Sequence, residues 1–144
     1  MGPRVAAALM PLLLVRHASA GDRAQWVGDD RKRPLDKRGR KRAHELVAQL
    51  APYPVEAILS SPARRCVETV EPLARARGLE IELHPQLTEE LESTEGVALV
   101  RSLVGRDVIV CGHGGLEHAL PDPRVFKKGS VLVVGPGLEL LDIL

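Results

Sequence analysis

The chain has 144 residues, of which 44% are hydrophobic and 27% are charged, and its formal net charge is +1 at pH 7. This length is enough for a real hydrophobic core, and we expect residues 1–144 to form a single domain. The small net charge gives no overall attraction to nucleic acid or to an anionic membrane, and one Trp, one Tyr and one Phe make no base-stacking platform for a nucleic acid. Neither is therefore expected as a partner, and any anion must be bound by a local group of arginines.

The apolar start of the chain imitates a secretion signal. Residues 5–15 are mostly apolar and precede Ala18-Ser19-Ala20, which has the form of a signal-peptidase site. Cleavage there would remove Arg16-His17, and the apolar run is too short to cross a bilayer. We expect residues 1–9 to be a frayed extension, and both Met1 and Met10 stay open as the natural first residue.

Apolar runs alternate along the chain with segments that have helical periodicity. Strands are expected at residues 12–16, 55–59, 79–83 and 107–111, helices at 36–50, 62–77 and 94–104, and a terminal hairpin at 131–134 and 138–143. This alternation is typical of an α/β fold. It predicts a three-layer α/β/α sandwich with a mostly parallel central sheet and a C-terminal antiparallel hairpin.

The second predicted helix has the clearest ends. Ser61 has the side chain of an N-cap and Pro62 suits the first helical position. Gly78 follows the last periodic residue and is expected to end the helix.

The two cysteines are Cys66 and Cys111, and they lie among apolar residues without the spacing of metal ligands. We expect buried free thiols, which suit a reducing cytoplasm, and therefore a cytoplasmic protein. Cys66 is expected to be a packing residue.

Three of the predicted strands are followed by residues that can bind or attack a phosphoryl group. Arg16-His17 ends the first strand, residues 60–65 follow the second, and His113 follows the fourth. The carboxyl ends of parallel strands lie at one edge of a sheet, where ligands bind. Arginine grips phosphate oxygens in a fork, and a histidine nitrogen can attack phosphorus. The sequence predicts a phosphate site, and no ligand set with metal spacing and no nucleotide-cradling Gly-x-x-x-x-Gly-Lys loop occurs in it, so no metal or cofactor is expected.

Four motifs in order carry a family resemblance. They are Leu14-Val15-Arg16-His17, Arg33-Pro34-Leu35 with Gly39, Ser60-Ser61-Pro62-x-x-Arg65-x-x-x-Thr69, and Gly112-His113-Gly114-Gly115. Each is common by chance, but all four at the expected strand ends are specific. From Leu12 to the final hairpin the chain resembles the histidine phosphatase (phosphoglycerate mutase-like) superfamily, in its short SixA-like branch of phosphohistidine phosphatases. The resemblance implies a phosphoglycerate mutase-like fold and a metal-independent phosphatase.

The same resemblance implies a role for each catalytic residue. His17 would be the nucleophile and would form a phosphohistidine that water hydrolyses. Arg16 and Arg65 would hold the phosphoryl oxygens, and His113 would donate a hydrogen bond to the same group. The family pattern places its arginine four residues before the threonine, which selects Arg65 over Arg64. Arg64 is expected to face solvent or to contact substrate.

Several supporting roles stay open. Leu-x-Glu carries the general acid in family members that use one, and Glu89 matches it, with Glu90 and Glu92 as alternatives. SixA-like members need no strong acid, because a phosphoramidate or anhydride leaving group requires less help. Ser19 would contact phosphate or orient the nucleophile, and Arg33 would line the rim of the pocket.

Three interpretations of the function follow. A short chain has no room for a large cap over the site, which favours phosphohistidine on a protein, as in SixA-like enzymes. Ala20-Gly21-Asp22-Arg23-x-x-Trp26 and residues 29–35 also resemble the phosphatase domain fused to Nudix hydrolases, which makes a nucleotide or another small phosphorylated molecule the alternative. A catalytically weak phosphate-binding module is the third reading. The sequence indicates no oligomeric state.

Overall fold

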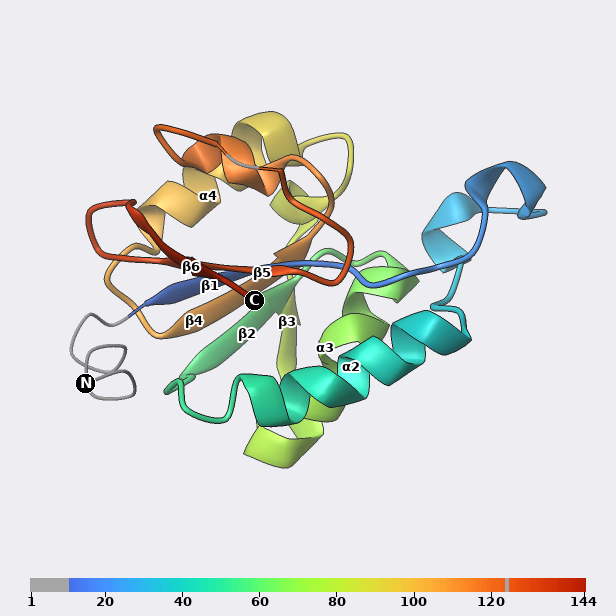
Figure 1. The fold of residues 1–144 in the computed structure, drawn as a ribbon. Coiled ribbons are helices and arrows are strands. Elements are labelled where there is room, and N and C mark those ends of the chain that lie inside the picture. The colour runs from blue at the N-terminus through green and yellow to red at the C-terminus, as the bar shows by residue number, and fades with distance from the viewer. Residues whose placement is uncertain (1–10, 124) are drawn as a thin grey trace.

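The computed structural model describes residues 11–123 and 125–144, so the expected frayed extension at residues 1–9 and the alternative start at Met10 lie outside the described residues. A six-stranded sheet forms the centre of the fold, in the order β3-β2-β4-β1-β5-β6 (Figure 1). Its strands are β1 (Leu12–Arg16), β2 (Ala57–Ser60), β3 (Ile81–Leu83), β4 (Val108–Gly112), β5 (Val131–Val134) and β6 (Leu140–Ile143). The pairings β1–β4, β4–β2 and β2–β3 are parallel, whereas β5 is antiparallel to both β1 and β6. The mostly parallel sheet with a terminal hairpin is confirmed.

Helical segments cover both faces of the sheet. The helices α2 (Lys37–Gln49) and α3 (Arg64–Arg77) pack on one face, and α4 (Val97–Ser102) covers the other (Figure 1). Short helical turns complete the layers and loops: η1 (Arg23–Gln25), η2 (Asp30–Lys32), η3 (Pro85–Leu87), η4 (Glu92–Gly96) and η5 (Leu116–Ala119). The three-layer α/β/α sandwich is confirmed. Within the described ranges, no helix combines the length and the apolar character needed to cross a membrane.

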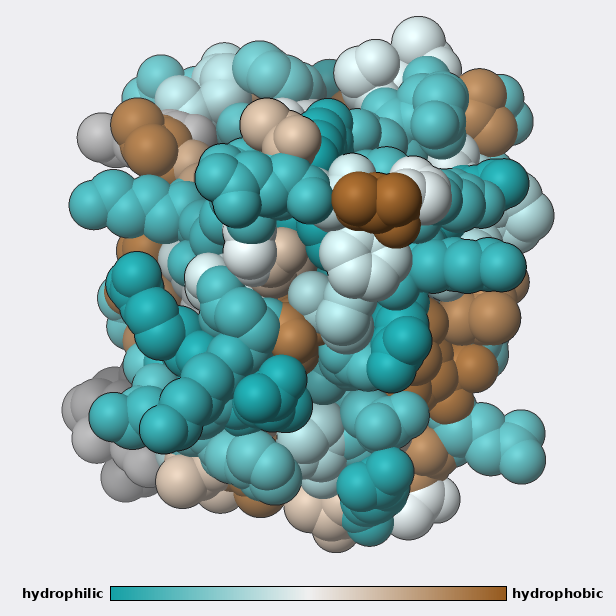
Figure 2. All heavy atoms as spheres, turned by 90° about the vertical axis from the view of Figure 1, so that its right-hand side faces the viewer, coloured by the Kyte–Doolittle hydropathy of each residue, from teal (hydrophilic) through white to brown (hydrophobic). Residues whose placement is uncertain are grey.

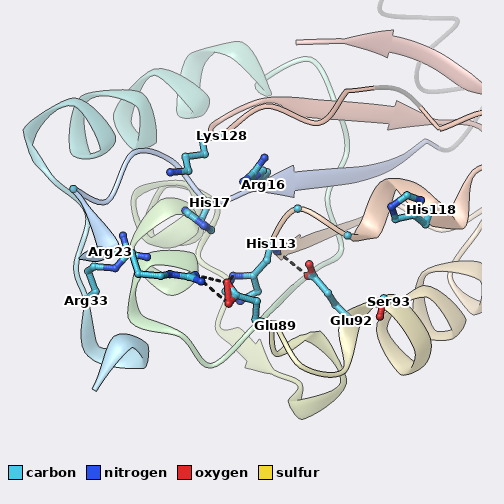
Figure 3. A pocket seen from close by; sticks show the side chains of 13 residues that line it. Arg16, His17, Arg23, Arg33, Glu89, Glu92, Ser93, His113, His118 and Lys128 are labelled. Atoms are coloured by element: carbon cyan, nitrogen blue, oxygen red, sulfur yellow. Dashed lines mark hydrogen bonds and ion pairs between the residues drawn. The ribbon is translucent and has the colours of Figure 1, made fainter. Parts of the chain in front are cut away.

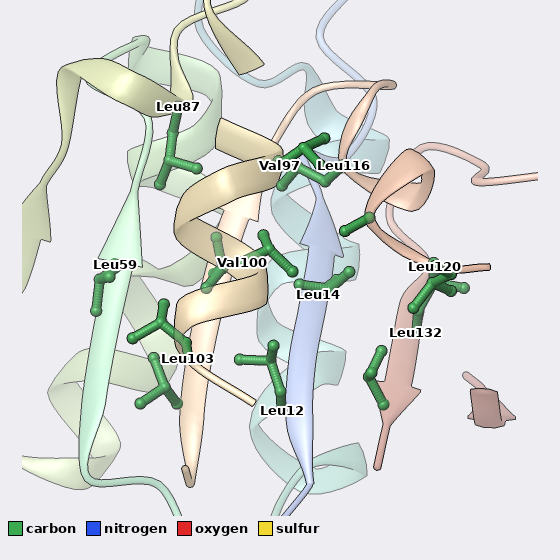
Figure 4. Close-up of a cluster of buried hydrophobic side chains, with 14 of the residues drawn as sticks. Leu12, Leu14, Leu59, Leu87, Val97, Val100, Leu103, Leu116, Leu120 and Leu132 are labelled. Carbon is green, nitrogen blue, oxygen red and sulfur yellow. The ribbon is translucent and has the colours of Figure 1, made fainter. Parts of the chain in front are cut away.

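The first strand is apolar throughout because both faces of the sheet are covered. Leu12 and Leu14 point into the cluster under α4, which Figure 4 shows, whereas Leu13 and Val15 point into the cluster under α2 and α3. All four side chains are at most 1% exposed. A strand buried on both faces has a continuous apolar sequence, whereas a strand with one exposed face alternates apolar and polar residues. Each such leucine contributes about 1.5–3 kcal/mol by burial, so this strand holds the catalytic edge firmly in place.

The start of α3 differs from the prediction. The helix begins at Arg64 with Ala63 as its N-cap residue, and not at Pro62 behind a Ser61 cap. The Ser61 hydroxyl accepts a hydrogen bond from the Ala63 backbone at 3.2 Å, but it also bonds the ring of His113 at 3.0 Å. That second contact holds Ser61 in the strand-to-helix turn. The other end is as predicted, since Gly78 is the C-cap in the left-handed region at φ 65°.

The predicted helix at 94–104 is also divided. The chain first makes a wide π-helical turn, η4, and only then the short α4. The wide turn carries the buried side chain of Glu92, whose carboxylate reaches the backbone N–H of His113. A regular helix predicted from periodicity alone misses this contact, because the partner comes from β4. Two strands are shorter than predicted, since β2 begins at Ala57 and β3 at Ile81.

Candidate active site

The carboxyl ends of β1, β4 and β2 lie side by side, as predicted. Arg16 is paired with Gly112 across β1 and β4, and Ser60 is paired with Cys111 across β2 and β4. A hollow of about 460 Å³ opens at this edge, within the usual size range of small-molecule sites. Its walls include Arg16, His17, Arg23, Arg33, Glu89 and His113 (Figure 3). We call it the main hollow.

His17 is held as a neutral imidazole with one defined tautomer. Its Nδ1 lies 2.8 Å from the backbone oxygen of Ala18, which can only accept, so Nδ1 carries the proton and Nε2 keeps its lone pair. The residue is 4% exposed. The pKa of His17 is lowered to about 3, chiefly by burial and also by the nearby charges of His113, Arg65 and Arg16, and the opposing bond to Ala18 offsets only part of this. The ring is therefore neutral over the physiological pH range.

His113 is held in the opposite state. Burial alone would lower its pKa, but the hydrogen bond to Cys66 and the charges of Cys66 and Glu92 outweigh burial and raise the pKa of His113. Its Nε2 lies 3.0 Å from the Ser61 hydroxyl and 3.6 Å from the Cys66 sulfur. The rings of His17 and His113 stand nearly edge to face, with centroids 5.5 Å apart. One histidine thus offers a lone pair and its neighbour offers a proton.

The two cysteines are buried free thiols, as predicted. Cys66 is more than a packing residue, however, because its sulfur contacts the ring of His113. Burial would raise the pKa of the Cys66 thiol, yet hydrogen bonds with Cys111 and His113 hold it below the ordinary value. Burial and the neighbouring Cys66 raise the pKa of Cys111. The acidified Cys66 is the main reason that His113 keeps its proton.

The arginines approach the site from two sides. Arg16 donates from Nη1 to the Phe126 backbone oxygen at 2.6 Å, and its guanidinium lies so close to Gly114 that a Cβ there would be 2.9 Å from Cζ. Arg65 is 2% exposed and donates to the Asp30 backbone oxygen at 2.8 Å. It lines a side recess that shares Glu89 and His113 with the main hollow, and it does not line the main hollow itself. By contrast, the Arg64 side chain is 59% exposed.

Arg33 and Ser19 have structural partners. Arg33 is 4% exposed, lines the main hollow as predicted, and bonds Asp30 at 2.9 Å and the Ala20 backbone oxygen at 2.5 Å. The Ser19 hydroxyl donates to Asp36 at 2.6 Å and is absent from the walls of the main hollow. Asp36 also accepts from the Gly39 backbone as the N-cap of α2. Ser19 therefore anchors the loop after the nucleophile.

Glu89 lies among cations. Its Oε1 is 2.6 Å from Arg23 Nη2 (Figure 3). The same oxygen is 3.3 Å from Arg65 Nη2 and 3.6 Å from His113 Nδ1. Burial would raise its pKa, but the hydrogen bond from Arg23 and the surrounding positive charges lower the pKa of Glu89 below its ordinary value. Placed this way, Glu89 is a carboxylate near neutral pH and has no proton to give. The alternative Glu90 is exposed and lines only the side recess.

Glu92 is the acidic residue that bonds the backbone of His113. Its Oε2 accepts from the His113 backbone N–H at 2.8 Å, and burial raises the pKa of Glu92 to about 7. A Cβ at Gly112 would lie 3.0 Å from this carboxylate, and one at Gly115 would lie 2.7 Å from it. The glycines beside His113 are thus required by the close approach of Glu92 and, at Gly114, of Arg16.

Three buried N–H groups at this edge have no hydrogen-bond acceptor within residues 11–123 and 125–144. They are Arg16 Nε, Arg65 Nε and His113 Nδ1. Buried donors of this kind are normally satisfied, and a tetrahedral oxyanion offers several acceptors at once. In the same part of the chain, no group of three or more His, Cys, Asp or Glu side chains could hold a metal ion. The donor set fits a phosphoryl group.

Comparisons with known proteins agree with this geometry. The family model of the histidine phosphatase superfamily (branch 1) matches residues 12–100, which include Arg16, His17 and Arg65 but not His113. The chain therefore belongs to the histidine phosphatase superfamily. A curated relative, the 8-oxo-(d)GTP phosphatase of Mycolicibacterium smegmatis, is 42% identical over 139 residues, covering 85% of this chain. The chain spans only 43% of that relative's length.

Solved structures show the same fold. The SixA protein of Agrobacterium tumefaciens, described as a phosphohistidine phosphatase, has a TM-score of 0.75 at 25% identity, and the match covers 94% of this chain and 97% of that one. A mycobacterial glucosyl-3-phosphoglycerate phosphatase has a TM-score of 0.70 at 17% identity, with 88% and 91% covered. The phosphoglycerate mutase-like fold is confirmed.

Sequence reasoning missed several members of the site. Arg23, Lys128 and the exposed His118 line the main hollow, and Ser61 and Cys66 contact His113. The contacts of Ser61 and Cys66 with His113 join segments far apart in the chain, and the motifs that contain Arg23 and Ser61 did not assign them to these positions. For Cys66 the sequence did offer a signal, because this residue directly follows Arg65 on the helix that reaches the site.

Proposed function

We propose that this protein is a phosphatase that works without a metal ion through a phosphohistidine on His17. The observation that carries the proposal is the neutral His17 Nε2 at the same edge of the sheet as three buried donors that have no hydrogen-bond acceptor among the described residues. The Nε2 lone pair attacks phosphorus, and the bond from phosphorus to the leaving group breaks with its electron pair on that group. Water then attacks the phosphohistidine, the phosphorus–nitrogen bond breaks with its electrons returning to Nε2, and phosphate leaves with the remaining proton going to solvent.

The neighbouring groups stabilise the charge on the transferred phosphoryl group. Arg16 and Arg65 hold its oxygens, and protonated His113 donates from Nδ1. Arg33 lines the rim, and Ser19 acts through the loop that follows the nucleophile. An entering phosphoryl group competes with Glu89 for its cations, so we assign Glu89 to binding.

This arrangement suits a leaving group that departs without a proton. A carboxylate at Glu89 gives little help to an alkoxide, whereas phosphate and imidazole leave more readily. Phosphoanhydrides and phosphohistidine both meet that condition. The substrate is therefore a nucleoside polyphosphate or a phosphorylated histidine of a protein.

We place the terminal phosphoryl group of a nucleoside polyphosphate first. The sequence alone favoured a SixA-like phosphohistidine phosphatase, but the relative at 42% identity is named for a nucleotide and the SixA structure is only 25% identical. Phosphohistidine on a protein remains the second candidate, supported by the SixA-like fold. We also propose that residues 1–144 form one histidine phosphatase domain and that the protein acts in the cytoplasm. A reducing cytoplasm suits the two buried free thiols.

Phosphate release from nucleoside triphosphates, a phosphohistidine protein and p-nitrophenyl phosphate tests the proposal. His17→Ala should lose at least ~10³-fold in rate, as removal of a nucleophile typically does. His44→Ala is the matched control, because this histidine of α2 is exposed and does not line the main hollow. The wild type should also form an acid-labile phosphoenzyme and keep its rate in EDTA.

Three results would contradict the proposal. They are equal rates for wild type and His17→Ala, a phosphoenzyme that is stable in acid, and loss of activity on chelation. A rate on phosphohistidine protein well above that on nucleotides would reverse the order of the two substrates.

A further inference from the structure

A second depression adjoins the main hollow. It measures about 250 Å³ and is lined by residues of η1 and of the segment before α2, among them Gly21, Gln25, Trp26, Arg33, Pro34 and Leu35. We call it the Trp26 groove. Gly21 and Arg33 line both the groove and the main hollow, so the two lie next to each other. Its volume is below that of a typical ligand site, which fits one ring system of a larger ligand.

Trp26 is presented to this groove and not to the core. It is 38% exposed and belongs to none of the buried hydrophobic clusters. Its indole Nε1 donates to the Asp29 backbone oxygen at 3.0 Å, which satisfies the polar edge and fixes the ring. What remains available is the aromatic face. An exposed indole whose polar atom is already bonded is suited to stacking.

The segment that carries Trp26 stands at the end of the molecule beyond the catalytic edge. In Figure 1 η1 and η2 project from the body of the fold beyond the start of α2, and Figure 2 looks onto that end. The surface there is mostly hydrophilic with scattered apolar patches, unlike the large continuous apolar area of a protein interface (Figure 2). A small planar ligand fits this surface better than a protein partner does.

We propose that the Trp26 groove is the subsite for the nucleobase of a substrate whose terminal phosphoryl group lies in the main hollow. This inference rests on the proposed function and adds the part of the site that would tell a nucleotide from other phosphates. The base stacks on the indole, and Pro34 and Leu35 supply apolar wall of the same groove. The Gln25 side-chain amide has no hydrogen bond within the described residues and is available to the edge of the base. Arg33, which lines both spaces, faces the phosphates between them.

A pair of substrates that differ only in the base tests this inference. A nucleoside triphosphate and inorganic triphosphate share the anhydride bonds, but only the first can reach the groove. Trp26→Ala should raise KM for the nucleotide about tenfold, within the range for loss of one stacking contact, and leave KM for inorganic triphosphate within twofold. Trp26→Phe, which keeps an aromatic face, should stay within about threefold of the wild type.

Val27→Ala is the matched control for this series. Val27 is the adjacent apolar residue, is 91% exposed and does not line the groove, so neither KM should change. An equal rise of both KM values in Trp26→Ala would mean that Trp26 only shapes the loop, and this would overturn the inference. No rise for either substrate would overturn it as well.

Fluorescence gives a second, independent readout, because Trp26 is the only tryptophan of the chain. In the His17→Ala protein, which cannot turn substrate over, saturating nucleoside triphosphate should change Trp26 emission and inorganic triphosphate should not. Absence of a saturable change would overturn the subsite even if the wild type hydrolyses nucleotides. Conversely, a wild type that releases no phosphate from either compound would refute the nucleotide as the first substrate, and the fluorescence titration would still decide whether the groove binds a base.

Discussion

The nucleophile should stay neutral and active well below the pH at which an ordinary histidine protonates. A histidine with the usual pKa of 6.5 is about 97% protonated at pH 5, which would leave roughly 3% of the nucleophile and cost about 30-fold in rate relative to pH 7.5. His17 has its pKa lowered to about 3, so about 99% of it remains neutral at pH 5. The pKa difference corresponds to about 5 kcal/mol favouring the neutral ring.

The assay is a pH titration of the histidine ring signals by NMR between pH 4 and 9. The chain has five histidines, and His17→Asn identifies the signal of His17 by its disappearance. We expect that signal to stay constant down to pH 4. The kcat/KM profile should show no step from His17 protonation over the same range.

A His17 titration midpoint near 6.5 would refute this reasoning, and so would a 30-fold fall in kcat/KM between pH 7.5 and 5 that follows the His17 signal. Either result would mean that burial and the neighbouring cations do not control the ring. A fall in rate that leaves the His17 signal unchanged would instead point to another titrating group, and the NMR titration separates the two cases.

The same depressed pKa carries a stability cost with a defined sign. Below pH 6.5 the unfolded chain binds a proton at His17 that the folded chain refuses until about pH 3. Stability is therefore lost as the pH falls through this window, by about 2 kcal/mol at pH 5 from this residue alone. His17→Asn should show a shallower loss of unfolding free energy between pH 6.5 and 4 than the wild type, measured by urea denaturation.

Three further perturbations have defined outcomes. The pKa of Glu92 is raised to about 7, so its contribution to stability is present below pH 4.5 and is lost as the pH rises through 7. Between pH 5 and pH 8 this loss is on the order of 2–3 kcal/mol of unfolding free energy. Glu92→Gln should abolish this pH dependence, as measured by urea denaturation at the two pH values. Gly39→Ala places a Cβ against the Ser19 backbone oxygen and should cost about 1–3 kcal/mol, seen as a lower Tm, and an unchanged Tm would contradict the packing. Cys66→Ala removes the main group that raises the pKa of His113, so the alkaline limb of the rate profile should move to lower pH; an unmoved limb would show that Cys66 only packs.

The sheet and the paired histidines were predictable because their information is local. The run Leu12–Val15 is apolar at every position, which indicates a strand covered on both faces, and both faces of β1 are covered in the structure. The position of Arg16-His17 directly after that run, and of His113 after another, then places both histidines at one edge by the rule for parallel strands. The periodicity of α2 and the glycine at the end of α3 are equally local features.

The supporting contacts were not predictable, because each joins distant segments. Ser61 has the side chain and position of a helix cap, and only the proximity of β4 shows that it bonds His113 instead. Glu92 lies in a segment with helical periodicity, and the wide turn that points it at His113 depends on a partner 21 residues away. For Glu89 the family pattern suggests an acid, but the charge of Arg23, brought in from a separate loop, decides that it is a carboxylate.

These contacts explain how two adjacent histidines can do opposite work at one pH. The rings are 5.5 Å apart and experience nearly the same burial, which taken alone would leave both neutral. His17 has only a backbone carbonyl at Nδ1, and burial together with the surrounding cations outweighs that bond, so the ring stays neutral. His113 has the acidified thiol of Cys66 at its ring and the carboxylate of Glu92 beneath its backbone, and these restore the proton that burial removes. Environments that drive two pKa values apart assign the roles of nucleophile and proton donor. The division of labour in this site therefore depends on Cys66 and Glu92 as much as on the two histidines.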